Sequence, residues 1–178
     1  IVTDVYGCTI DTIVIINQYD SLGIIIDEKI NVSCYDGNDG SIEVSAFGGV
    51  GPYDWRWDNT ISIPVGHPQQ LDPLIENLQI GTYTVTVTDS KGCVAVADSI
   101  EIIQPAPLQL LDTVIQDVSC NGGDDGQAEV IVSSGGTPGY TYLWDNGETT
   151  STATSLSAGI NTCTVTDANG CTGSITVD

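Results

Sequence analysis

The chain has 178 residues, of which 24 are acidic and only 3 are basic, so its formal net charge at pH 7 is −21. A charge of this size repels nucleic acid and anionic membrane surfaces, which excludes nucleic-acid binding and leaves cations, glycans and basic proteins as partners. Five of the six cysteines recur at fixed positions rather than in CxxC metal pairs, which favours an oxidising, extracellular compartment. No run of 18 apolar residues occurs, so we expect no membrane insertion in this segment.

The predicted strands alternate apolar and polar residues, and no segment sustains a helical period. In chain order these strands cover residues 10–16, 22–30, 41–46, 53–57, 83–87, 100–102 and 127–133. Glycine-rich and asparagine-rich turns separate them, because these residues tolerate the positive φ of tight connections. Short strands at this spacing indicate two-sheet sandwiches, and Pro105 and Pro107 predict a stiff linker between two of them.

Two sequence patterns recur along the chain. Val-Ser-Cys followed by a turn of Asp, Asn and Gly begins at Val32 and again at Val118, and Val-Thr-Asp-x-x-Gly-Cys ends at Cys8, Cys93 and Cys171. Such repetition is typical of tandem domains, so we expect the chain to be a segment of a longer array. Residues 1–17 would be the final strands of a truncated repeat, residues 18–104 the first complete sandwich and residues 105–178 the second.

The first 30 residues are not expected to fold as a domain of their own. They contain the last strand of one repeat and the first strand of the next, without the rest of the earlier sandwich. Ile13 and Ile15 would then lie on an apolar face that nothing covers.

The motifs together resemble the SprB repeat of Bacteroidetes cell-surface adhesins. Beside the two patterns above, the shared motifs are Gly-Gly-x-x-x-Tyr-x-Tyr/Trp-x-Trp and Leu-x-x-Gly, in fixed order over residues 31–104 and 117–178. The resemblance implies tandem Ig-like (PKD-like) β-sandwich repeats in an extended rod. It also implies a giant surface protein that is exported by the type IX system and used in gliding motility or adhesion. The chain departs from the pattern in an insertion at residues 60–77, and in Asn161 and Cys163 where the first repeat has Tyr83 and Val85.

Tyr53, Trp55 and Trp57 lie on one face of a predicted strand. A row of rings could stack on sugars, but in a sandwich this spacing is more typical of the core face, and we interpret the three as core. Cys163 takes the place of Val85 in the same register, so we expect it to be a buried, unpaired thiol.

The cysteines allow two pairings. Two cysteines per repeat suggest Cys34 with Cys93 and Cys120 with Cys171. In an Ig-like strand order, however, the first cysteine follows the first strand and the second lies in the last hairpin, at opposite ends of the sandwich. Bridged Cα atoms must lie within roughly 7 Å, which favours an inter-repeat pair of Cys34 with Cys171. The partners of the remaining exposed cysteines would then lie in other repeats.

Acidic turns make calcium the one metal worth considering. Carboxylate and amide oxygens gather close together as calcium requires, but a full EF-hand loop is missing, and a plain Asx turn explains the same residues. A calcium site between the two repeats would take ligands from the lower end of the first sandwich and from the upper loops of the second. The candidate ligands are Asp36, Asn38, Asp39, Asp124, Asp125 and Asp167.

Four segments resemble the Asp-Ser/Thr-apolar acceptor that Bacteroidetes use for O-glycosylation of exported proteins. All four fall around the repeat junctions, where sugar would mask strand edges. The candidate acceptors are Thr12, Ser21, Ser99 and Thr113.

We therefore expect a structural and adhesive repeat segment of a giant secreted bacterial cell-surface adhesin or filament, related to gliding motility, with no enzymatic activity and no cofactor beyond possible Ca2+. Its expected partners are neighbouring repeats of the same chain and surface glycans or other cell-surface proteins. The alternative is an accessory glycan-binding β-sandwich of a secreted polysaccharide-degrading enzyme, which would need exposed aromatic rings. No GxSxG, HExxH or P-loop motif is present.

Overall fold

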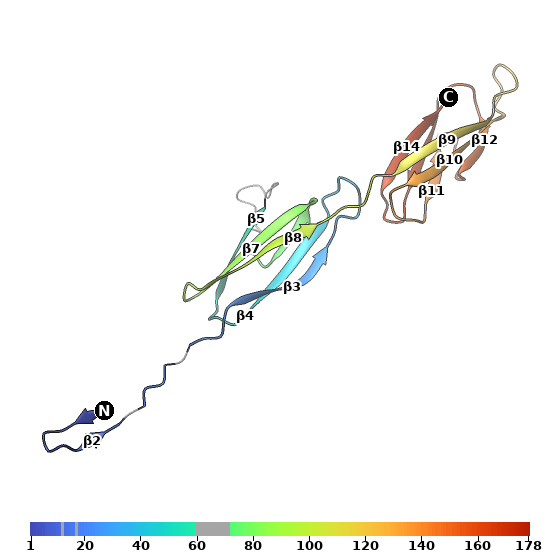
Figure 1. Cartoon of the computed structure of the whole chain (residues 1–178). Coiled ribbons are helices and arrows are strands. Elements are labelled where there is room, and N and C mark those ends of the chain that lie inside the picture. Colours follow the sequence, from blue (N-terminus) through green and yellow to red (C-terminus); the bar gives the residue numbers. More distant parts are fainter. Residues whose placement is uncertain (12, 17, 60–71) are drawn as a thin grey trace.

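The computed structural model describes residues 1–11, 13–16, 18–59 and 72–178, and every regular element in these ranges is a β-strand. Two sandwiches follow one another end to end, and a short N-terminal hairpin lies apart from both (Figure 1). Among the described residues, no helix could cross a membrane. The hairpin consists of β1 (Val2–Thr3) and β2 (Thr9–Ile10).

The two sandwiches have the same strand order. The first comprises β3 (Gly23–Ile30), β4 (Gly40–Phe47), β5 (Tyr53–Asn59), β6 (Leu74–Leu78), β7 (Gly81–Asp89) and β8 (Val94–Ile102). The second comprises β9 (Gln109–Gln116), β10 (Gly126–Ser134), β11 (Thr141–Trp144), β12 (Thr152–Leu156), β13 (Asn161–Thr166) and β14 (Thr172–Val177).

Each sandwich consists of two antiparallel three-stranded sheets. The sheets are β3-β4-β6 and β5-β7-β8 in the first sandwich, and β9-β10-β12 and β11-β13-β14 in the second. This is the arrangement of an Ig-like domain in which the first, second and fifth strands face the third, sixth and seventh, and the described residues contain no fourth strand. The predicted all-β, Ig-like fold is therefore confirmed.

The core of each sandwich forms where the inward faces of the two sheets meet. Alternation places Ile42 and Val44 of β4 opposite Trp57 and Val85 in the first sandwich, and all four are buried. Trp144 takes the place of Trp57 in the second sandwich, and both are only 1% exposed. Trp55 is also buried, and Tyr53 packs against the same core. The interpretation of these rings as core residues is confirmed.

Trp57, Trp144 and two tyrosines donate hydrogen bonds to the backbone at equivalent positions of the two sandwiches. Trp57 Nε1 donates to the carbonyl of Asp72 at 2.8 Å, and Trp144 Nε1 donates to that of Thr150 at 2.9 Å. In the same way, Tyr53 and Tyr140 donate their hydroxyls to the carbonyls of Gly48 and Gly135. A buried tryptophan N–H or tyrosine hydroxyl needs a hydrogen-bond acceptor. At these positions both repeats therefore contain the same aromatic residues and the same hydrogen bonds.

The corner before the sixth strand of the Ig-like order is fixed in each sandwich by a different side chain. In the first, the hydroxyl of Tyr83 donates to the carbonyl of Gln79, four residues earlier, at 2.9 Å. This is the bond of the tyrosine corner that recurs in Ig-like domains. In the second, Asn161 replaces the tyrosine, and its Nδ2 donates to the carbonyl of Ser157, again four residues earlier, at 3.0 Å. The asparagine thus makes the same side-chain-to-backbone hydrogen bond as the tyrosine but lacks its aromatic ring.

Cys163 is buried in the second core and carries a free thiol, as predicted. It faces inward from β13 in the register of Val85, two residues after the corner side chain. Burial raises the pKa of the Cys163 thiol. The residue therefore acts as a small apolar group in this core.

The N-terminal segment leaves its isoleucines exposed, as predicted, but among the described residues of the predicted strand 10–16 only Ile10 lies in a strand. Ile13 and Ile15 are 88% and 75% exposed, whereas Ile100 and Ile102, their counterparts in the Ser/Thr-Ile-x-Ile-Ile sequence of the first repeat, are buried. The sequence of a core strand is present without the sheets that would cover it.

Tyr83→Phe is expected to destabilise the first sandwich by about 1 kcal/mol, because it removes one hydrogen bond and leaves the Gln79 carbonyl without this donor. Urea unfolding followed by circular dichroism measures the change. Tyr6→Phe removes a hydroxyl from the exposed N-terminal hairpin and serves as the control. Equal midpoints for the two variants would contradict the role of the corner bond.

Candidate functional site

The two sandwiches are joined by a disulfide between Cys34 and Cys171, whose Cα atoms lie 5.4 Å apart. Cys34 lies in the turn between β3 and β4, which we call the cysteine turn (residues 32–40). Cys171 lies in the connection between β13 and β14, which we call the cysteine hairpin (residues 165–172). With the linker of residues 103–108, the disulfide gives the sandwiches a second covalent connection.

Asp167 holds the cysteine hairpin in shape. Its carboxylate accepts hydrogen bonds from the backbone N–H groups of Thr137, Asn169 and Cys171, at 2.8, 2.9 and 2.9 Å. The bond to Thr137 ties the hairpin to the turn after β10, and the bond to Cys171 fixes the cysteine backbone. One buried carboxylate thus satisfies three donors that the strand ladder leaves unpaired.

The same arrangement occurs in the other two copies of the motif. Asp89 accepts from the N–H groups of Val50, Lys91 and Cys93 at 3.0, 2.9 and 2.8 Å. Asp4 accepts from Tyr6 and Cys8 at 2.9 Å each, the two bonds available within the hairpin itself. In all three copies, Val-Thr-Asp-x-x-Gly-Cys therefore forms a hairpin in which the aspartate holds the backbone of the cysteine.

The cysteine turn is held by a carboxylate as well. Asp39 Oδ1 accepts from the N–H of Ser33 at 2.9 Å, and the N–H of Gly37 donates to the carbonyl of Cys34. Asp125, Ser119, Gly123 and Cys120 repeat both bonds in the second sandwich. The turn needs a positive φ between the cysteine and this glycine, which Asp36 adopts at 57° and Gly122 at 83°.

Further hydrogen bonds surround the disulfide. Asn169 Nδ2 donates to the carbonyl of Ser33 at 3.3 Å, across the junction. The side-chain oxygen of Gln104 accepts from the N–H of Asp36 at 2.9 Å, which ties the linker to the cysteine turn. On the other side, the N–H of Gly136 donates to the carbonyl of Ala106. The linker is thus bonded to both sandwiches, and a hollow of about 360 Å3 remains beside Tyr35 and the two linker prolines.

The sequence did not predict the hydrogen bonds that Asn169 and Gln104 make at this junction. It indicated Asp89 only as part of a motif. A signal for the aspartates existed, because the same residue precedes all three hairpin cysteines by four positions. No comparable signal marks Asn169, since the matching position in the first repeat is Lys91.

The alternative pairing, Cys34 with Cys93 and Cys120 with Cys171, is wrong. Cys34 lies at the end of the first sandwich where β8 finishes, since the N–H of Val32 donates to the carbonyl of Ile103. Cys93 lies just before β8 begins, and nine strand residues span about 30 Å. In the structure Cys8, Cys93 and Cys120 are exposed thiols.

Burial disfavours the charged form of Asp167, but the hydrogen bonds from Thr137, Cys171 and Asn169 outweigh it and hold the pKa of this carboxyl below its usual value. The pKa of Asp89 is lowered in the same way, with burial opposed by the N–H groups of Cys93, Val50 and Lys91. Hydrogen bonds from Ser33 lower the pKa of Asp39, and those from Ser119 lower that of Asp125. Each of these carboxyls is more stable ionised in the folded chain than in the unfolded chain.

No group of three His, Cys, Asp or Glu side chains among the described residues is placed to hold a metal ion. The carboxylates of Asp39, Asp125 and Asp167 are engaged by backbone donors, whereas Asp36, Asn38 and Asp124 are exposed. Calcium binding stays a prediction.

Three of the four candidate glycosylation residues lie on the surface of the structure. Ser21, Ser99 and Thr113 are exposed, and Ser99 sits at a bulge of β8 with a φ of 57°. Thr12 lies outside the described residues. Glycosylation also stays a prediction.

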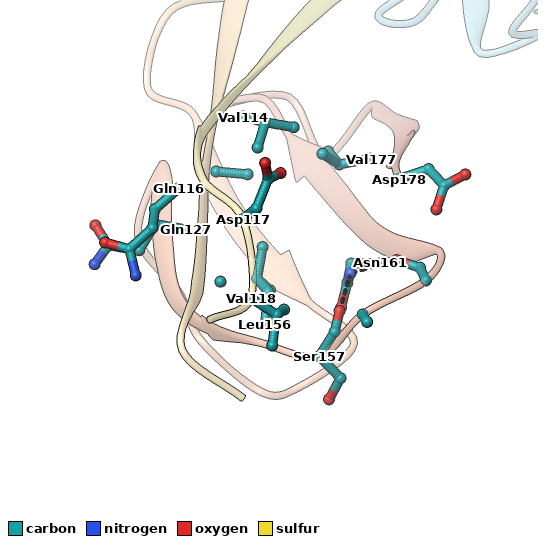
Figure 2. Close-up of a pocket in the computed structure, with 14 residues that line it drawn as sticks. Val114, Gln116, Asp117, Val118, Gln127, Leu156, Ser157, Asn161, Val177 and Asp178 are labelled. Atoms are coloured by element: carbon teal, nitrogen blue, oxygen red, sulfur yellow. Dashed lines mark hydrogen bonds between the residues drawn. The ribbon is translucent and has the colours of Figure 1, made fainter. Parts of the chain in front are cut away.

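One hollow of about 280 Å3 lies at the far end of the second sandwich, next to Val118, Gly126 and Leu156 (Figure 2). In the first sandwich, Ile102 packs over Gly40, the counterpart of Gly126. Val177 pairs with Asn161 as Ile100 pairs with Tyr83, so the hollow corresponds in position to the buried side chain of Ile102 in the first sandwich. We interpret the hollow as the place of a core side chain rather than as a ligand site.

The glycan-binding alternative requires exposed aromatic rings on which sugars could stack. Trp55, Trp57 and Trp144 are buried, so none of the three presents a ring face to solvent. The rings that were candidates for sugar stacking serve the two cores instead.

The family model of the SprB repeat matches the chain in two segments, residues 28–60 and residues 113–149. Both segments are similar to the SprB repeat. Each match begins in the first strand of a sandwich, includes the cysteine turn and runs past the strand that carries Trp57 or Trp144. The structure therefore assigns one SprB repeat to each sandwich. No curated protein matches the chain.

Three solved structures are among those to which the chain is similar. A C-terminal fragment of intimin, solved with the intimin-binding domain of its translocated receptor, is 14% identical, with a TM-score of 0.39 over 90% of this chain and 64% of that one. Fibronectin(III)-like modules of Clostridium thermocellum CbhA are 14% identical, with a TM-score of 0.37 over 86% and 91% of the two chains. The amphioxus IgVJ-C2 molecule is 15% identical, with a TM-score of 0.30 over 91% and 97%. This SprB repeat pair thus spans less than two thirds of the intimin fragment.

Cys34→Ser is expected to widen the range of angles between the two sandwiches, because only the linker and a few hydrogen bonds then connect them. Small-angle X-ray scattering measures this as a broader distance distribution, while tryptophan fluorescence confirms that both cores remain folded. Cys93→Ser changes the equivalent of Cys171 in the first hairpin, where no disulfide exists, and is the control. Identical scattering from both variants would show that the disulfide does not restrain the junction.

The stability of the SprB pair is expected to fall as the pH drops below about 4, where ionised aspartates become protonated. A lowered pKa stabilises the folded chain above the unfolded value, and this contribution disappears as the pH falls through the folded value. Asp167→Asn should lower the melting temperature at pH 7 and make its dependence on pH shallower. Asp112→Asn removes one carboxylate from the exposed face of β9 and controls for the change in charge. Parallel curves for the Asp167 variant and the wild type between pH 2 and 7 would contradict the linkage.

Proposed function

We propose that this SprB repeat pair is a structural and adhesive segment of a secreted bacterial cell-surface protein, and that it has no enzymatic activity. The observation that carries the proposal is the junction. Two sandwiches of the same kind are joined end to end by a linker and a disulfide, and the motifs on both sides of the disulfide recur in the chain. Repeated domains that are connected in this way transmit force and set distance.

The double connection favours a rod-like segment. A single linker permits rotation about several axes, whereas a second covalent connection leaves mainly rotation about the line that joins the two. The hydrogen bonds of Gln104 and Asn169 restrict that remaining motion. A stalk that carries load benefits from this restriction.

The charge of the chain suits an exposed surface segment. A net charge of −21 keeps neighbouring stalks apart and soluble, and it favours partners that are cationic or uncharged. We propose surface glycans or other cell-surface proteins as the partners. Export by the type IX system and a role in gliding motility follow from the family resemblance and complete the proposal.

Antibodies against the purified SprB pair test the location and the role. We expect them to label intact cells of the source organism and to reduce attachment of these cells to glass or to glycan-coated surfaces. Antigen-binding fragments should act in the same way, which excludes cross-linking by the antibody. Labelling that appears only after cell lysis would reject a surface role. Labelled cells with unchanged attachment and unchanged gliding would reject an adhesive one.

A further inference from the structure

Both halves of the junction occur a second time, at the two outer ends of the SprB pair. Cys93 lies in a cysteine hairpin of the first sandwich, and Cys120 lies in a cysteine turn of the second. Both carry exposed, free thiols. Their counterparts, Cys171 and Cys34, form the disulfide of the junction.

The loops that carry the free cysteines, Cys93 and Cys120, have the same hydrogen bonds as the loops that carry the bonded cysteines, Cys171 and Cys34. Asp89 fixes the N–H of Cys93 at 2.8 Å and Asp167 fixes that of Cys171 at 2.9 Å. The cysteine turns agree equally well, since the carboxylates of Asp125 and Asp39 each accept a 2.9 Å bond from the serine before the cysteine. Because side chains of the same chain already bond in this geometry, the free halves are preformed for the same bond.

The two free cysteines of one copy cannot reach each other. Cys93 lies at the end of the first sandwich opposite Cys34, and Cys120 lies at the end of the second opposite Cys171. Each sandwich has strands of up to nine residues, about 30 Å, so two sandwiches separate the thiols. A bond between them requires a second copy that is aligned head to tail.

The charges at the two ends complement each other. Lys91, one of three basic residues in the chain, takes the place of Asn169, which donates across the existing junction to the carbonyl of Ser33. The facing turn of a second copy would present the carbonyl of Ser119 beside Asp124, which is exposed, and Asp125. A lysine can donate to that carbonyl and also reduce the repulsion between two acidic ends.

We propose that each free cysteine bonds the facing cysteine of another SprB repeat, so that separate copies of this pair join head to tail through a disulfide between Cys120 of one copy and Cys93 of the next, in a contact that repeats the junction within the chain. The two thiols give two protons and two electrons to a disulfide oxidant such as oxidised glutathione, which becomes two molecules of reduced glutathione. The inference concerns the assembly of the segment and does not depend on the proposed adhesive role.

Incubation of the purified chain in a glutathione redox buffer tests the proposal. We expect the wild type to form a ladder of disulfide-linked oligomers on non-reducing gels, and mass spectrometry of mixed 15N-labelled and unlabelled copies to identify a Cys93–Cys120 peptide that joins the two. Cys93→Ser and Cys120→Ser should each remain monomeric. A mixture of these two variants should stop at the dimer, because one variant supplies only the turn cysteine and the other only the hairpin cysteine.

Cys8 provides the control for pairing that does not need a docked sandwich, since its hairpin has the same Asp-to-cysteine hydrogen bond but lies apart from both sandwiches. Cys8→Ser should leave the ladder unchanged. A wild type that stays monomeric, a ladder that depends on Cys8, or a main product that links Cys120 to Cys120 would each overturn the proposal.

Substitutions at Lys91 test whether the contact resembles the junction or arises by random collision. Lys91→Asn restores the residue of the second repeat and should cross-link at a rate within about twofold of the wild type. Lys91→Glu should slow the reaction about tenfold at low ionic strength. The difference should nearly vanish at 1 M salt, where the screening length is about 3 Å. Equal rates for the two variants at low salt would contradict the docking contact.

Discussion

The hydrogen bonds that Asp167 accepts are the interaction on which the junction depends. A tight hairpin turns several N–H groups away from the strand ladder, and the ionised side chain of Asp167 satisfies two of them, together with the N–H of Thr137 in the neighbouring turn. This fixes the backbone of Cys171 and ties the hairpin to the neighbouring turn through Thr137. The disulfide can then form between two prepared loops rather than between flexible ones, which lowers the conformational entropy that its formation costs.

Charge explains why the junction uses covalent bonds. Two sandwiches of a chain with 24 acidic and 3 basic residues repel each other at close range. Few direct hydrogen bonds cross from one sandwich to the other, among them that of Asn169 to Ser33. Such a contact would hold the sandwiches together weakly on its own. The linker and the Cys34–Cys171 disulfide outweigh this repulsion without requiring a large apolar interface.

The two repeats keep their hydrogen bonds while their side chains diverge. Asn161 replaces Tyr83 but donates to the carbonyl in the matching position, and Gly122 replaces Asp36 where the backbone needs a positive φ. Cys163 replaces Val85 inside the core with a somewhat smaller side chain. The geometry of the turns and corners is therefore more constant than the identity of the residues that produce it.

The sequence by itself determined the fold class, the inward face of the aromatic strands, the burial of Cys163 and the uncovered face of Ile13 and Ile15. These features follow from local periodicity and from the alignment of one repeat with the other, which need no knowledge of distant contacts. Only the tertiary structure decided that Cys34 bonds Cys171, because this depends on which ends of the two sandwiches meet. It alone revealed the roles of Asn169 and Gln104, which act across the junction and differ from their counterparts in the sequence. It also showed that the carboxylates of Asp39 and Asp167 accept hydrogen bonds from backbone N–H groups. Composition and spacing alone cannot distinguish such carboxylates from metal ligands.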